Sequence, residues 1–138
     1  MNIIEELLAH DPAKIKPPTG TVEIALSRFG GKVWAFPIQA IDAEYASQLQ
    51  EESMEISMDD DDMQVKMRNT HAVMVKTIIA GCPEIFQSDK LKEKWNLQTN
   101  KQLVHFMLEQ GEMNQLKKAI DNLSKSEIKV IKDDELKN

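Results

Sequence analysis

The chain of 138 residues has little of several features on which specialised classes of protein depend. It has a single cysteine, Cys82, so no disulfide can form within it. No apolar run approaches the roughly 18 residues of a membrane span. Acidic residues stand near the N-terminus, where a signal peptide carries positive charge. These absences argue against a disulfide scaffold, a membrane protein and a secreted protein, and they predict a soluble cytoplasmic one.

Lysine and arginine are outnumbered by acidic residues, 17 to 23, and the net charge is −6. The segment 47–64 holds seven acidic residues and no lysine or arginine, so the rest of the chain is close to neutral. Neither part shows the basic stripe with which proteins neutralise phosphates. We therefore expect no nucleic-acid partner.

What remains is the composition of an ordinary globular protein, with 41% hydrophobic and 29% charged residues. The length favours one domain. Within it, proline, glycine and charge patterns predict four regions: an arm and linker (1–19), a hairpin region with a short helix (20–68), a helical region (69–124) and a frayed tail (125–138).

The first half is expected to begin with a short helix and continue as a β-hairpin. Asn2 can cap a helix whose apolar face ends before three prolines. Apolar and polar residues then alternate from Val22 to Leu26, and Gly30-Gly31 supplies the backbone freedom of a tight turn. Residues 33–38 form the return strand, after which Asp42 caps a short helix.

The acidic segment predicts a second hairpin. Methionine and other apolar residues alternate with polar ones on both sides of the tetrad of residues 59–62, which would form the tip. A helix through residues 64–68 is the competing prediction. The tetrad does not match a calcium loop, because the sixth position is Gln64 and the twelfth is Thr70. We interpret it as a solvated turn.

The second half is expected to be helical. Caps at Asn69 or Thr70, at Ser88 and at Thr99 begin three helices, and a fourth follows Gly111. The predicted fold class is therefore α+β, with one or two N-terminal antiparallel hairpins packed on a C-terminal bundle of about four helices.

No catalytic, cofactor-binding or metal-binding constellation is found in the sequence. The three histidines are far apart in the chain and match no metal motif. Cys82 has no cysteine partner, and a single free cysteine is usually a small buried hydrophobe. We expect no enzyme.

Methionine is the one residue in surplus, with eight in the chain. Methionine fills irregular cores, and it also lines grooves that accept varied apolar partners. For the second possibility, the candidate partner-binding residues are Met63, Met67, Met74, Phe106 and Met107.

Three stretches together suggest a family. They are an N-terminal "IIEELLAHDPAKIK", a "PEI…LKEKW" segment after the first long helix, and a Gly111-Glu112 step that opens the last amphipathic helix. With the "TVEIALSRFGGKVWAFPIQAID" hairpin, this pattern resembles the XkdN-like phage tail assembly chaperones over most of the chain.

The resemblance implies a non-enzymatic protein that acts in the host bacterial cytoplasm and is absent from the mature virion. Its implied partners are the tape measure protein and the tail tube protein, and self-association stays open. The alternative is an acidic regulatory adaptor that binds a basic site on a host protein.

Overall fold

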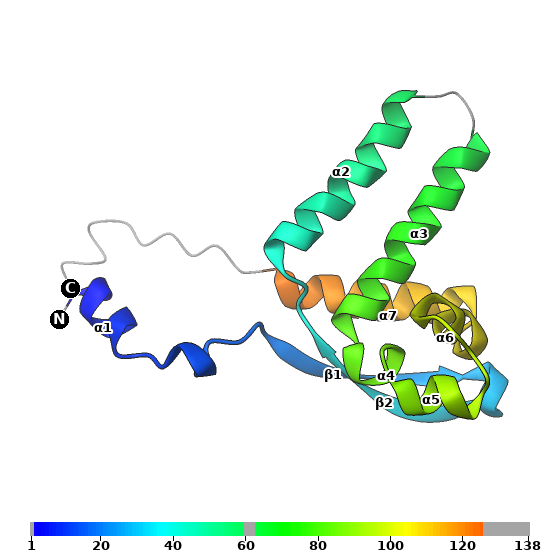
Figure 1. Ribbon diagram of the computed structural model, residues 1–138, viewed down its shortest axis with the longest axis horizontal. Coiled ribbons are helices and arrows are strands. Elements are labelled where there is room, and N and C mark those ends of the chain that lie inside the picture. The colour runs from blue at the N-terminus through cyan, green and yellow to red at the C-terminus, as the bar shows by residue number, and fades with distance from the viewer. Residues whose placement is uncertain (1, 60–62, 126–138) are drawn as a thin grey trace, which may run out of the picture.

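A computed structural model describes residues 2–59 and 63–125, and for 54–59 and 63–69 it describes the backbone alone. In these ranges the chain forms one two-stranded sheet, seven α-helices and two short 3-10 turns (Figure 1). In chain order they are α1 (Ile3–Leu8), η1 (Pro12–Lys14), β1 (Thr19–Leu26), η2 (Ser27–Phe29), β2 (Lys32–Gln39), α2 (Ala43–Asp59), α3 (Met63–Gly81), α4 (Pro83–Phe86), α5 (Asp89–Lys94), α6 (Asn100–Met107) and α7 (Gln110–Ser124).

The predicted first hairpin is confirmed. Strands β1 and β2 pair antiparallel, with Thr19 opposite Gln39 and Leu26 opposite Lys32. Gly30 and Gly31 take φ angles of 74° and 77°, a conformation that is strained for residues with a Cβ. Burial alternates along β1 as its polarity does, so one face of the sheet packs inward.

The predicted second hairpin is wrong, because helices α2 and α3 occupy its two sides. Glutamate, glutamine, lysine and methionine favour helices over strands, and the alternation covered only a few residues on each side. The competing prediction of a helix through residues 64–68 is confirmed. A cap at Asn69 or Thr70 is also wrong, since α3 already begins at Met63. Of the predicted acidic tip, Asp59 ends α2 and residues 60–62 lie outside the described part.

The helical second half is confirmed, and the fold is α+β. The Ser88 hydroxyl caps α5 by accepting from the N–H of Leu91, and the Thr99 hydroxyl caps α6 by accepting from the N–H of Gln102. Asp42 caps α2 through the N–H of Tyr45, although this helix has 17 residues and is not short. Figure 1 shows α2 and α3 leaving the sheet as a pair of antiparallel helices, with α7 packed beside the sheet. Helices α4 to α6 follow α3 and lead toward the end of the sheet where the β-hairpin turns.

One apolar core joins the sheet to α3, α4, α6 and α7, and we call the sheet together with α3 to α7 the body. Phe36 of β2 stacks on Phe86 of α4, with the ring centroids 6.1 Å apart. Cys82 is fully buried as predicted, and this burial raises the pKa of its thiol to about 12. Gly81 lies against Ile120, and a Cβ at this glycine would come within 2.5 Å of the isoleucine side chain. Helices α3 and α7 therefore approach closely at this point.

Polar contacts fix the turn of the β-hairpin to the start of α7. Glu112 is buried, and its carboxylate accepts bonds from the N–H and the hydroxyl of Ser27 at 3.2 and 3.1 Å. Burial of the Glu112 carboxyl disfavours its charged form and raises its pKa. Hydrogen bonds donated by Glu109 and Ser27, together with the nearby positive charge of Arg28, have the larger effect, so the net result is a lowered pKa. The Arg28 guanidinium also pairs with Glu109 at 2.8 Å.

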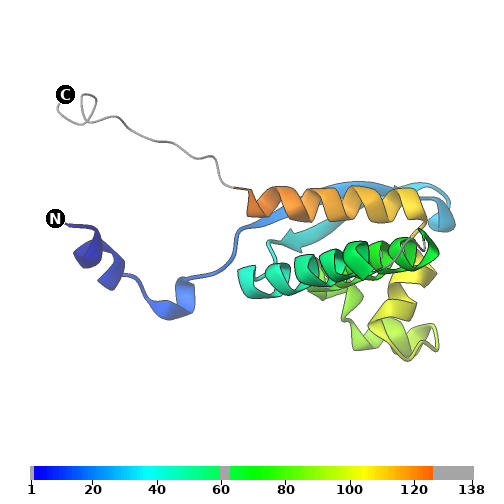
Figure 2. The ribbon, with the colours of Figure 1, turned by 90° about the horizontal axis from the view of Figure 1, so that it is seen from above.

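The N-terminal segment stands apart from this packing. Residues 2–18, which we call the arm, are exposed throughout, and Figures 1 and 2 show α1 projecting from one end of the sheet. The Asn2 side chain caps α1 by accepting from the N–H of Glu5, as predicted.

Candidate partner-binding surface

An apolar pocket of about 280 Å³ opens between the turn end of the β-hairpin and helices α4 to α6. The hairpin supplies one wall and the helices supply the other, so residues far apart in sequence meet there. We call it the aromatic pocket; its lining residues are Leu26, Phe29, Trp34, Ala35, Phe36, Ile85, Leu91, Trp95 and Met107.

Aromatic rings build much of the wall and part of the rim. Phe29 lies edge-on to Trp34 at 6.4 Å and packs against Trp95 at 5.9 Å. Trp95 in turn stacks on Phe106 at 4.9 Å. Trp34 and Phe106 each keep 42% of their area exposed, whereas a large aromatic side chain gains most from burial. The pocket therefore offers uncovered aromatic surface to a partner.

Both tryptophans of the chain line this pocket. The ammonium group of Lys32 lies 4.4 Å above the ring of Trp34, in the geometry of a cation–π contact. The arrangement can bind an apolar group that has an acidic residue beside it.

The predicted partner-binding residues fall into three groups. Phe106 and Met107 belong to the aromatic pocket, the first through its stack on Trp95 and the second as a lining residue. Met74 is 5% exposed and packs inside the core. Met63 and Met67 lie on the first turns of α3, and their side chains are outside the described part of the structure.

The other rings of the pocket were not predicted, since Phe29 and Trp34 come from the β-hairpin and Trp95 from the end of α5, about 60 residues later. A signal was present in the clustering of the scarce aromatic residues just before and after the glycine pair. Their exposure depends on how the hairpin meets α5, and no local pattern encodes that contact.

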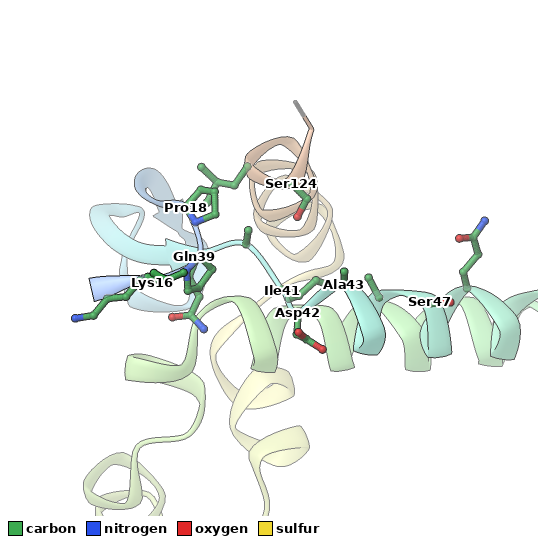
Figure 3. A pocket seen from close by; sticks show the side chains of 14 residues that line it. Lys16, Pro18, Gln39, Ile41, Asp42, Ala43, Ser47 and Ser124 are labelled. Atoms are coloured by element: carbon green, nitrogen blue, oxygen red, sulfur yellow. The ribbon is translucent and has the colours of Figure 1, made fainter. Parts of the chain in front are cut away.

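A second, larger hollow of about 830 Å³ lies at the root of the arm (Figure 3). Its side chains come from the arm, the end of β2, the start of α2 and the end of α7, and they include Lys16, Gln39, Asp42 and Ser124. It opens broadly to solvent, and one of its walls is the exposed arm itself. Its lining mixes polar and apolar residues, whereas the lining of the aromatic pocket is apolar throughout.

The structure also brings together two histidines that are separated in sequence. The Nε2 atoms of His71 on α3 and His105 on α6 lie 2.7 Å apart. Nδ1 of His105 lies 3.0 Å from the carbonyl oxygen of Lys101, which can only accept, so Nδ1 carries the proton. A neutral His105 that carries its proton on Nδ1 can then accept a bond from His71 through Nε2. Among the described residues, no group of three or more potential ligands could hold a metal ion.

A comparison with protein families decides the identity. The model of the phage XkdN-like tail assembly chaperone proteins matches residues 4–136. The chain belongs to this family. It is a phage tail assembly chaperone, as the sequence resemblance implied, and its partners are tail proteins.

No significant match was found among curated proteins or among solved structures. In the described part of this chaperone, no helix combines the length and apolarity needed to cross a membrane.

Proposed function

We propose that this chaperone binds apolar helical segments of the tape measure protein and assists assembly of the tail tube. It would act in the host bacterial cytoplasm, without catalysing a reaction and without entering the mature virion. Membership of the tail assembly chaperone family supports the general role. A tape measure protein that exposes long amphipathic helices would aggregate alone, and a partner that covers their apolar faces would prevent this.

The aromatic pocket is the observation that carries this proposal. Amphipathic helices bind by laying apolar anchors from one face into a groove. The volume of about 280 Å³ is just below the range of roughly 300–1,000 Å³ found for small-molecule sites. It suits side chains that project from a helix better than the helix itself. Aromatic residues with exposed area are also the usual centres of binding energy at interfaces.

Within this proposal Phe106 and Met107 keep the role predicted for them, and Trp34 becomes the main anchor. Met63 and Met67 stay predicted as additional contacts, because they are four residues apart on α3 and so share one face of that helix. Binding at the aromatic pocket does not depend on them.

Co-expression with the tape measure protein encoded beside this chaperone tests the proposal. Soluble yield and co-purification should be measured for the natural chain and for Trp34→Ala and Phe106→Ala. Each of these variants should weaken binding tenfold or more, which corresponds to about 1.4 kcal/mol. Val33→Ala is the matched control: Val33 is 56% exposed and adjacent to Trp34, but it points to the other face of the strand. It should bind like the natural chain.

Two results would contradict the proposal. In the first, the tape measure protein stays equally soluble without the chaperone and never co-purifies with it. In the second, the chaperone instead captures a basic host protein that high salt releases, which would favour the acidic adaptor.

A further inference from the structure

Helix α1 carries an apolar face that no residue of the described ranges, 2–59 and 63–125, covers. Ile3, Ile4, Leu7 and Leu8 recur at helical spacing and are 62–79% exposed. Isolated helices shorter than roughly 12–15 residues are marginal in water, and α1 has six residues. Packing against a partner would stabilise both the helix and its apolar face.

The same chain contains an uncovered apolar surface of matching kind, namely the aromatic pocket. The two lie at opposite ends of the sheet: the arm joins β1 at Thr19, whereas the pocket begins at Leu26, where β1 ends (Figures 1 and 2). The arm points away from the pocket of its own chain. This placement favours contact between two copies over contact within one.

Charge also fits. The two ionisable residues of α1, Glu5 and Glu6, are both acidic and stand beside its apolar residues. Lys32 lies over Trp34 at a wall of the pocket. An acidic, apolar helix would therefore be attracted to this rim as well as to the aromatic rings.

We propose that α1 of one chain docks into the aromatic pocket of a second copy. If two chains exchange arms, the contact closes into a symmetric dimer. If the proposed function holds, a tail protein helix displaces α1 and takes its place in the pocket.

Sedimentation equilibrium of the chaperone alone, over a range of concentrations, tests the docking. The natural chain should self-associate, and Leu7→Glu combined with Leu8→Glu should raise the dissociation constant at least tenfold. Ala9→Glu combined with His10→Glu is the matched control, since it adds the same two acids just beyond the apolar face and should retain most of the association. All four residues are exposed, so neither variant should unfold the body.

Mixing two defective variants separates docking between copies from docking within one chain. The Leu7→Glu, Leu8→Glu chain keeps the pocket but loses the arm contact, whereas Trp34→Ala with Phe106→Ala keeps the arm but loses the pocket. Each should be monomeric alone, and together they should form a 1:1 complex through the one intact pair of surfaces.

The inference is overturned if the natural chain is monomeric throughout, if the arm variant associates as strongly as the natural chain, or if the two variants fail to combine. Tryptophan emission gives a second readout because both tryptophans line the pocket. A shift that depends on the arm but not on concentration would mean docking within one chain, which also overturns the proposal. No tail protein is present in these experiments, so their failure would leave the proposed function standing, and the reverse also holds.

Discussion

Apolar residues of the same kinds are buried in the body and exposed in the arm. In the body, Leu103, Leu116 and Ile120 are fully buried between the sheet and the helices. In the arm, Leu7 and Leu8 are 62% and 79% exposed, although their helix is capped and amphipathic. The difference shows that a well-formed local signal does not bury a side chain. Burial requires a second surface within reach, and the arm packs against none in the part of the chain that the structure describes.

The largest difference is expected when one leucine of the body and one of the arm are each replaced by alanine and the free energies of unfolding are compared. Leu116→Ala leaves a cavity in the core and should lower the free energy of unfolding by about 2–5 kcal/mol. Leu7→Ala should change it by less than about 0.5 kcal/mol, because that side chain is 62% exposed. Urea denaturation at a concentration where the chain is monomeric checks both. Equal losses would mean that the arm belongs to the folded body.

The next largest effect compares two other glycines, Gly81 and Gly111, whose replacement by alanine should change the free energy of unfolding in opposite directions. Gly81→Ala places a Cβ against the buried Ile120 side chain and should cost about 1–3 kcal/mol by overpacking the contact of α3 with α7. Gly111 lies in the first turn of α7 with nothing within 4 Å of an added Cβ. Gly111→Ala should therefore stabilise by about 0.5–1 kcal/mol through helix propensity. If Gly81→Ala is as stable as the natural chain, the close approach of α3 and α7 is wrong.

Helix caps allow the same comparison with matched chemistry. Thr99→Ala removes the cap of α6 and should cost the body about 1 kcal/mol. Asn2→Ala removes an equivalent cap from α1 and should leave the denaturation midpoint of the body unchanged. Helicity measured by circular dichroism should fall slightly in the second variant. A lower midpoint for Asn2→Ala would show that α1 supports the body.

The smallest effect expected is on the pH dependence of stability. Burial, with the nearby His71, Lys101 and Arg28, lowers the pKa of His105 in the folded protein, against a weaker opposing bond to the Lys101 carbonyl. The unfolded chain then binds more protons, so this contribution is complete above the unfolded pKa of roughly 6.5 and is lost as the pH falls from there through the lower pKa of the folded protein. His105→Gln should flatten the melting temperature between neutral and mildly acidic pH. His10→Gln, in the exposed arm, is the control, and an identical profile for His105→Gln would exclude the histidine pair as the cause.

Much of the body could be predicted from sequence because its signals are local. The glycine pair fixed the turn of the first hairpin, and Ser88 and Thr99 marked helix starts by a hydrogen bond that spans three residues. The error over the acidic segment has a physical source. Apolar residues two and four residues apart, such as Met63, Val65 and Met67, satisfy both strand and helix patterns, and helix propensity decided between them.

The residues of the aromatic pocket could be predicted from the sequence only in part. Phe106 and Met107 were predicted for it, but their neighbours Phe29 and Trp34 come from a hairpin more than 70 residues earlier in the chain. The pairing of His71 with His105 likewise depends on how α3 meets α6. Contacts of this kind follow from the packing of whole elements, which residue spacing does not encode.

The bonds between Ser27 and Glu112 also bear on how the chain is made in the cell. They join residues 85 positions apart, so the β-hairpin leaves the ribosome long before α7 exists to cover its apolar face. At synthesis rates of roughly 5–20 residues per second, that interval is about 4 to 17 seconds. During it, Ile24, Leu26 and Phe36 have no α7 to pack against. A protein that assists the assembly of others thus passes through an exposed, aggregation-prone stage of its own, and its yield should depend on how quickly translation delivers the last helix.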